Sequence, residues 1–240
     1  MKTQVEERFS EFFEKWVCQL EEHVEQLLSV SKEKLNEAGL QALVSKVTRH
    51  YEEYYTVKWA RAQEDVLAFF NPVWLSSLEN AYSWITDWKP SLAFQVIDTL
   101  RKTEVPGISL ADMSEEQVKK IEELRVKVRL EKDKVEREME RQQVSLADSR
   151  IVQLAQVASR VRDGDVVVLV DGMMEEALKE LLEGLESVMK AADCVRVKTL
   201  TGALEVLNPL QCVDFLAAIF MLQIRLRKRG KKREKPIERE

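Results

Sequence analysis

Apolar side chains recur at every third or fourth position along most of the chain, which is the spacing of one face of an α-helix. Residues 5–28 begin this pattern, and a second periodic stretch covers residues 40–70. Asn71-Pro72 is typical of a helix cap followed by the first helical residue. We therefore expect a third helix from this pair onward, with an inner face of Trp74, Leu78, Tyr82 and Ile85.

The same periodicity continues through the rest of the chain. Lys89-Pro90 precedes a fourth helical stretch, and Pro106-Gly107 breaks it. Residues Ser114 to Gln117 match a capping box, in which the serine and glutamine side chains satisfy free helix amides. Further helices are expected at 93–100, 118–139, 151–161 and 174–207, and a last one begins at Asn208-Pro209.

A valine-rich run at residues 163–171 is the one place that resembles a β-strand feeding a nucleotide-binding turn. No glycine-rich phosphate motif accompanies it, and no second strand is evident as a partner. We interpret this run as an interhelical connection or the frayed start of a helix, with an extended conformation as the alternative.

Composition supports a helical fold. The 240 residues include 7 Gly and 5 Pro, fewer than a fold with many tight turns requires, and 45% are hydrophobic, enough for a substantial core. The sequence therefore predicts an all-α fold, a multi-helix bundle of long amphipathic helices with no substantial β-sheet. Cys18, Cys194 and Cys212 are widely spaced, so we expect reduced and partly buried thiols rather than a disulfide or zinc site.

Charge is distributed unevenly. Residues 225–240 contain nine basic and three acidic side chains, a net charge of +6, whereas residues 1–224 carry a net charge of −11. We therefore divide the chain into a helical domain, 1–224, and a basic C-terminal tail, 225–240. The charged N-terminus predicts no signal peptide, and the lack of a long apolar run predicts no membrane-spanning helix.

Catalytic and metal-binding patterns are absent from the sequence. His23 and His50 each stand apart from other metal ligands, and both are expected at the surface or its boundary. Adjacent carboxylates on a helix point in different directions and normally face water. No nucleophile motif or phosphate loop occurs, so we expect neither an enzyme nor a bound cofactor or metal.

The segment RHYEEYYTVKWARAQED, residues 49–65, concentrates aromatic and charged side chains. Tyr51, Tyr55 and Trp59 follow one another by four residues and form a single helical stripe. The segment has three basic and four acidic residues, which disfavours stacking on a phosphate-bearing strand. The stripe is therefore assigned to the core, although a core assignment leaves Tyr54 and Lys58 on a neighbouring line unexplained.

The order of residues in this region resembles a known family. The pattern is His-Tyr-x-x-Tyr-Tyr, then Glu-Asp-Val, Trp-x-x-Ser-Leu-Glu and Trp-Lys-Pro-Ser, within residues 50–91. It is similar to the DOG domain, named for Delay of Germination, which also forms the C-terminal part of TGA-type bZIP transcription factors. The segments 110–125 and 192–219 look like later blocks of the same domain. The resemblance implies a structural core of Tyr51, Tyr55, Trp59, Trp74, Trp84, Trp88 and Pro90.

The resemblance also implies a function. We expect a non-enzymatic plant regulatory protein, of the stand-alone type without a bZIP region, involved in seed dormancy or germination, transcriptional regulation and abscisic acid signalling. Its partners would be other proteins, including a second copy or a related chain, with no membrane association. Sequence-specific DNA binding by this chain alone is not expected. The implied location is the nucleus, with the cytoplasm as a second compartment.

Two groups of residues are candidates for contact with other proteins. Phe12, Phe13 and Trp16 make the first helix more apolar than one core-facing stripe requires, which favours either partner binding or a wide buried face. The basic tail fits a nuclear-import signal or a solvated helix end. The candidate import residues are Lys228, Arg229, Lys231, Lys232 and Arg233.

Three alternatives remain open from the sequence. Aromatic and methionine side chains between helices could enclose a hydrophobic or planar ligand or cofactor. The tail could associate with DNA through its charge. A DOG-domain role in pollen development is the third alternative.

Overall fold

The computed structural model describes residues 3–30, 36–102, 109–147, 152–153, 156–157 and 164–234, with side chains in the last range from residue 172 onward. Over these ranges the chain is helical and contains no β-strand beyond one isolated bridge, so the predicted all-α class is confirmed. The helices are α1 (Gln4–Ser29), α2 (Glu37–Ala62), α3 (Leu67–Phe70), α4 (Ser77–Ala81), α5 (Ser91–Lys102), the 3-10 turn η1 (Ser109–Asp112), α6 (Glu115–Ser145), α8 (Gly164–Val206) and α9 (Pro209–Glu234).

Side-chain caps explain where the long helices begin. Thr3 accepts a hydrogen bond from the amide of Glu6, and the Glu6 carboxylate accepts from the Thr3 amide, which completes a capping box before α1. Ser114 and Gln117 form the same arrangement before α6, as the sequence predicts. Asn208 accepts from the amide of Gln211 and caps α9 at its predicted start.

The region between α2 and α5 differs from the prediction. The second helix ends at Ala62 rather than at residue 70, and no helix starts at Asn71-Pro72. The next cap is Ser76, whose hydroxyl accepts from the amide of Glu79, so that α4 is only five residues long. After α4 the chain runs in turns to residue 90, held by paired backbone bonds between Trp84 and Asp87. We call residues 82–90 the aromatic connector.

Two further predictions concern weakly patterned segments. The backbone of the valine-rich run is helical from Gly164, so this run begins α8 and is not a strand. Pro106-Gly107 and most of the helix expected at 151–161 lie outside the described residues.

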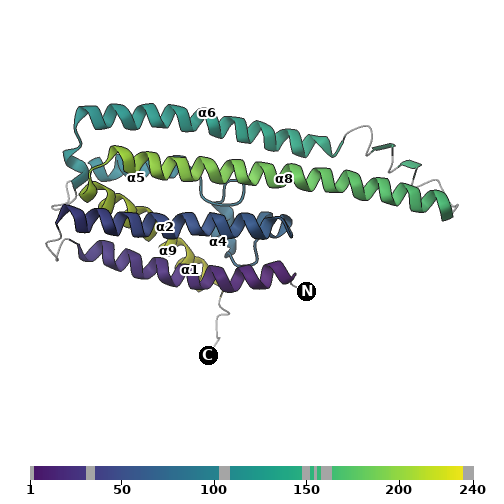
Figure 1. The fold of residues 1–240 in the computed structure, drawn as a ribbon, viewed down its shortest axis with the longest axis horizontal. Coiled ribbons are helices and arrows are strands. Elements are labelled where there is room, and N and C mark those ends of the chain that lie inside the picture. Colours follow the sequence, from purple (N-terminus) through teal and green to yellow (C-terminus); the bar gives the residue numbers. More distant parts are fainter. Residues whose placement is uncertain are drawn as a thin grey trace.

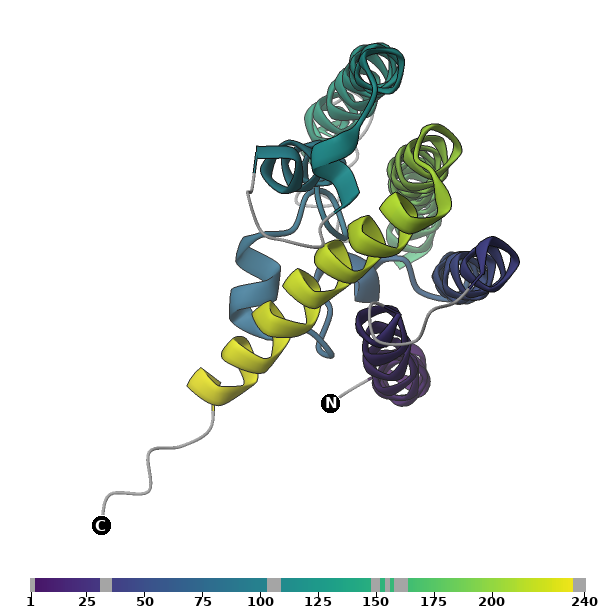
Figure 2. The ribbon, with the colours of Figure 1, turned by 90° about the vertical axis from the view of Figure 1, so that its left-hand side faces the viewer.

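The helices pack as a bundle with one long protruding pair. Figure 1 shows α6 and α8 side by side, with their far ends extending past α1 and α2. Figure 2 shows α9 crossing the bundle obliquely, and it contacts α1, α2, α4 and α5. Because α9 comes last in the sequence and contacts helices of the first half, its apolar residues join the two ends of the chain into one core. These residues include Phe215, Leu216, Ile219, Phe220 and Ile224, all buried.

By length and composition, α9 is apolar enough to cross a membrane, and no other described helix is. Half of its apolar window is buried against the rest of the protein. The contacts of α9 with four other helices account for this apolar character as core packing.

Candidate functional site

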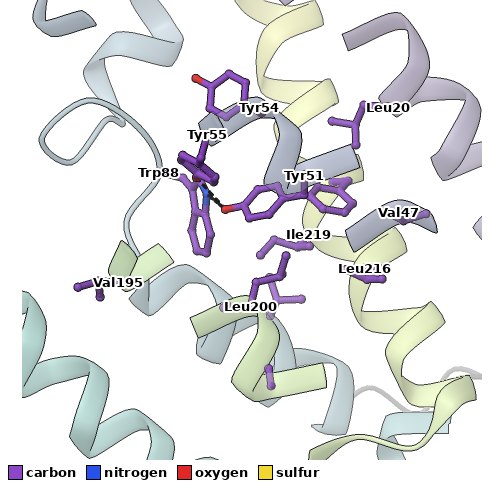
Figure 3. Packing of buried hydrophobic residues seen from close by; sticks show 14 of the residues in the cluster. Leu20, Val47, Tyr51, Tyr54, Tyr55, Trp88, Val195, Leu200, Leu216 and Ile219 are labelled. Carbon is purple, nitrogen blue, oxygen red and sulfur yellow. Dashed lines mark hydrogen bonds between the residues drawn. The ribbon is translucent and has the colours of Figure 1, made fainter. Parts of the chain in front are cut away.

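The tyrosines of α2 meet the aromatic connector in the interior. The hydroxyls of Tyr51 and Tyr55 lie 2.8 Å apart, and Trp88 Nε1 donates to the Tyr51 hydroxyl over 2.7 Å, as Figure 3 shows. Tyr54 is also buried. Burial, followed by the nearby Asp87 carboxylate, raises the pKa of all three tyrosines well above the usual value of 10.0. All three phenols are therefore neutral, and those of Tyr51 and Tyr55 are hydrogen-bonding groups of the core.

A fully buried ionic cluster lies beside these tyrosines. Lys58 Nζ donates to Asp193 Oδ1 and to Thr86 Oγ1, both over 2.9 Å, and Arg196 Nη1 donates to the same Asp193 oxygen over 2.5 Å. Trp59 Nε1 donates to the second oxygen of Asp193 over 3.0 Å. We call Lys58, Asp193 and Arg196 the buried triad.

The buried triad also holds the aromatic connector in place. Arg196 Nε donates to the carbonyl of Trp88 over 2.7 Å, and its Nη2 donates to the carbonyl of Trp84. The guanidinium thereby satisfies two carbonyls of an irregular segment that has few backbone partners of its own. Residues from α2 and α8, far apart in sequence, fix the connector from two sides.

Burial and pairing with carboxylates act in opposite directions on the pKa values of Lys58 and Arg196. Burial lowers the pKa of Lys58, and Asp193 partly offsets that effect. Burial also disfavours charged Arg196, but Asp193 and then Asp87 raise its pKa above the usual value. Two carboxylates thus balance two cations in the interior, as a buried charge network requires.

A cavity of about 540 Å³ opens on the other side of the connector. Its walls come from α1, α2, α4, α5, α9 and the connector, and its inner lining includes Phe13, Trp16, Leu20, Tyr51, Tyr54 and Trp88. The cavity opens to solvent at a rim that includes the exposed residues Tyr82 and Leu222.

The cavity accounts for the aromatic residues of the first helix. Phe13 and Trp16 are buried and Phe12 is half-buried, so the three do not form an exposed partner face. Trp16 Nε1 donates to the carbonyl of His50 over 3.0 Å, which fixes the indole against α2. The width of the apolar stripe on α1 reflects the core and the cavity wall together.

Both histidines are buried, whereas the sequence predicts positions at the surface or its boundary. The rings of His23 and His50 lie 4.9 Å apart, and His50 Nε2 donates to the carbonyl of Trp16 over 3.1 Å. Burial lowers the pKa of both rings, and for His23 the neighbouring His50 lowers it further. Nδ1 of His23 is buried and has no hydrogen-bond partner among the residues that the structure describes. Glutamates lie near both residues in the sequence, and no local pattern predicts that the two rings meet between α1 and α2.

The thiols also differ from the prediction of partly buried positions. Cys18 and Cys194 are exposed, whereas Cys212 is buried and its pKa is raised by burial to about 12. All three are free thiols.

The basic end of α9 is part of the folded domain. The helix continues through the predicted boundary at residue 224 as far as Glu234. Arg227 is buried, donates to Glu14 over 2.5 Å and to the Trp74 carbonyl over 3.0 Å, and lies over the ring of Phe13. Lys231 also binds Glu14, over 3.0 Å.

The candidate import residues divide into two groups. Lys228 and Lys231 are exposed but form ion pairs with glutamates of α1, at 3.2 and 3.0 Å. Arg229, Lys232 and Arg233 are exposed, and none of them pairs with a carboxylate among the described residues. These last three remain available to a partner.

The residues that the family resemblance assigns to the core lie in or beside it. Tyr51, Tyr55, Trp74, Trp84 and Trp88 are buried hydrophobic residues, and Pro90 is buried at the start of α5. Trp59 is half-buried and contacts Asp193.

Sequence reasoning missed the buried triad, although one signal was available. Asp193 and Arg196 are three residues apart in the otherwise apolar run ADCVRV, a spacing that places opposite charges on one helical face. Over the described residues no group of three or more potential metal ligands gathers. The polar clusters that the structure shows are suited to holding helices together and to lining a binding cavity.

Comparisons with known proteins agree with these features. A family model described as seed dormancy control matches residues 18–99, which include the tyrosines of α2 and the connector. The chain is 50% identical over 234 residues to the protein DOG1-like 4 of Arabidopsis thaliana, covering 97% of this chain and 96% of that protein. It is 31% identical to the Arabidopsis protein RESPONSE TO ABA AND SALT 1, covering 96% of this chain and 98% of that protein.

A more distant similarity extends to transcription factors. The chain is 27% identical over 213 residues to the Arabidopsis transcription factor TGA6, covering 89% of this chain and 60% of that protein.

Proposed function

The chain belongs to the DOG family, and from this membership we propose that it is a non-enzymatic regulator of seed dormancy or germination that acts through contacts with other proteins. The observation that carries the proposal is 50% identity to a DOG1-like protein over almost the full length of both chains. The relatives are DOG-like and TGA proteins of plants.

The geometry supports a role in binding rather than in catalysis. The buried triad is closed to solvent, so its polar groups hold the fold and cannot reach a substrate. Apolar side chains remain exposed on the protruding helix pair, among them Val126, Leu130, Leu178 and Leu182. Exposed apolar groups of this kind are compatible with protein contacts.

We also place the protein in the nucleus, with abscisic acid signalling as the context. One relative is named for its response to ABA and salt, and others are transcription factors. The unpaired basic side chains at the end of α9 fit recognition by an import receptor.

The proposed role in dormancy is tested with seeds that lack the protein. Freshly harvested seeds should germinate in a larger fraction than wild-type seeds, and expression of the complete chain should restore the wild-type fraction. Unchanged germination together with a defect in pollen would contradict the proposal and favour the pollen-development alternative.

A further inference from the structure

The cavity between α1, α2, α5 and α9 has the size and lining of a small-molecule site. Its volume of about 540 Å³ falls within the range of sites that enclose most of a drug-sized ligand. Aromatic rings from three elements face it: Trp16 of α1, Tyr51 and Tyr54 of α2, and Trp88 of the connector. Flat aromatic walls favour a ligand that itself contains rings, because ring faces and edges pack closely against one another.

The charged groups in the inner wall already have partners. Arg227 is held by Glu14 and Glu79, at 2.5 and 3.3 Å. Asp87 accepts a hydrogen bond from the amide of Trp88 over 2.7 Å. A ligand that carried its own charge into this region would be left without a counter-charge, so the enclosed part of the ligand must be apolar.

The rim of the cavity is different. Tyr82 is 70% exposed and Leu222 is 46% exposed, and both line the opening. Lys89 is an exposed cation at the same opening, and it forms no ion pair with any described carboxylate. Glu136, the acid that Lys89 influences, is itself bound by Lys132 at 2.6 Å and by Trp84 Nε1 at 2.9 Å. The Lys89 ammonium is therefore free to meet an anion.

We propose that this cavity binds a small molecule with a ring-bearing apolar body and one anionic group. The body lies between Trp16, Tyr54 and Trp88, and the anion meets Lys89 at the rim. The proposal goes beyond the role in dormancy and does not depend on it, since a regulator can contact its partners with or without a ligand.

Two fluorescent probes of nearly equal shape test the proposal on the complete chain. Anilinonaphthalene sulfonate has an apolar ring system and one anionic group, and phenylnaphthylamine has the same ring system without the charge. Both should bind at one saturable site per chain. The sulfonate should bind about threefold to fivefold more tightly, the gain expected for one partly exposed ion pair.

Substitutions locate the bound probe. Leu92→Trp adds an indole to the half-buried lining of the cavity and should weaken both probes about tenfold or more. Lys89→Gln should abolish the preference for the sulfonate and leave the affinity of the uncharged probe unchanged. The matched controls are Leu130→Trp and Lys134→Gln, at exposed positions on α6, and neither should change binding.

A circular dichroism melt shows whether each variant folds. If Leu92→Trp does not fold, Gln95→Trp narrows the opening from an exposed rim position and should weaken both probes in the same way. Equal binding to the cavity variants and to wild type would overturn the proposal. So would unsaturable binding, or an intact sulfonate preference in Lys89→Gln.

Discussion

At the scale of single residues, the molecule depends on buried charges that compensate one another. Asp193 receives hydrogen bonds from Lys58, Arg196 and Trp59, so one carboxylate joins α2 to α8. Removing one member of such a group leaves its partners charged and unpaired in the interior, which costs more than the lost contact alone.

Asp193→Asn keeps the shape of the side chain but leaves Lys58 and Arg196 without their shared counter-charge. We expect a loss of about 3–5 kcal/mol in the free energy of unfolding, measured by urea denaturation. Glu131→Gln is the matched control, because Glu131 pairs with an exposed lysine, Lys198, at 3.1 Å and should cost less than about 1 kcal/mol. Equal stability of the two variants would show that the buried triad does not support the fold.

The histidine pair makes stability depend on pH. The pKa values of His23 and His50 lie below 6.5 in the folded protein, so the unfolded chain binds more protons as the solution is acidified. The histidine contribution is therefore fully present above pH 6.5 and is lost as the pH falls from 6.5 through the lower folded pKa values.

Urea denaturation at several pH values checks this dependence. Wild type should lose stability on acidification more steeply than a variant with both His23→Gln and His50→Gln. Identical slopes for the two proteins would show that neither ring has a lowered pKa. A variant with only Lys46→Gln, which removes a neighbouring cation that also lowers the His23 pKa, should retain most of the wild-type slope.

At the scale of elements, α4 and α9 pack so closely at Gly230 that a side chain larger than that of glycine would clash. A Cβ atom added at Gly230 would lie 1.9 Å from the Ser76 hydroxyl oxygen, and that hydroxyl caps α4. The glycine thus lets the basic end of α9 lie directly on the cap of the neighbouring helix.

Gly230→Ala should destabilise the protein by about 1–3 kcal/mol, because the added methyl group forces apart a closely packed contact. The cost should be smaller when Ser76→Gly removes the opposing side chain, and thermal unfolding of the single and double variants measures this coupling. Gly172→Ala is the control: nothing lies within 4 Å of its added Cβ, so it should be neutral or stabilising. Additive effects of Gly230→Ala and Ser76→Gly would contradict the proposed contact.

The sequence predicts the long helices well because each presents an unbroken apolar face and several have recognisable caps. It does not predict the structure of residues 63–90. There the spacing of Trp74 and Leu78 is that of a helical face, but the Ser76–Glu79 capping box begins a new short helix between them. The predicted caps at Ser114 and Asn208 are present, and the structure adds an equivalent one at Ser76. Local pairing of a serine with a glutamate, rather than periodicity, decides the structure here.

The burial of Lys58 and the cavity could not be predicted for a different reason. Lys58 and Asp193 are 135 positions apart, and no local pattern indicates that a lysine beside two tyrosines will lose all contact with water. The cavity is formed by five helices and the aromatic connector, whose relative positions are set only when α9 crosses the bundle. Both features are properties of tertiary packing.

At the scale of the whole molecule, α9 has two roles. Its apolar first part closes the core, and its basic last part lies on the acidic first helix through Glu14 and Glu21. Deleting residues 225–240 would therefore remove Arg227 and disturb the fold as well as the import signal. A test of import must leave Arg227 in place.

Replacement of Arg229, Lys232 and Arg233 by serine removes exposed cations without touching the contacts of Arg227. A fusion to tandem fluorescent proteins, too large to diffuse through nuclear pores, should lose its nuclear accumulation in this variant. Serine at Lys119, Lys127 and Lys134, three exposed positions on α6, is the control with equal charge loss and should remain nuclear. Unchanged nuclear signal in the first variant would refute the import role of the tail.

Proximity labelling in seed tissue is the most direct test of the central claim, that this protein regulates dormancy through contacts with other proteins in the nucleus. The complete chain is fused to a labelling enzyme, and the same enzyme carrying an unrelated nuclear signal serves as the reference. The account predicts a labelled set enriched over that reference in nuclear regulatory proteins, including components of transcription or hormone signalling. A set indistinguishable from the reference, or one dominated by cytosolic metabolic enzymes, would contradict it.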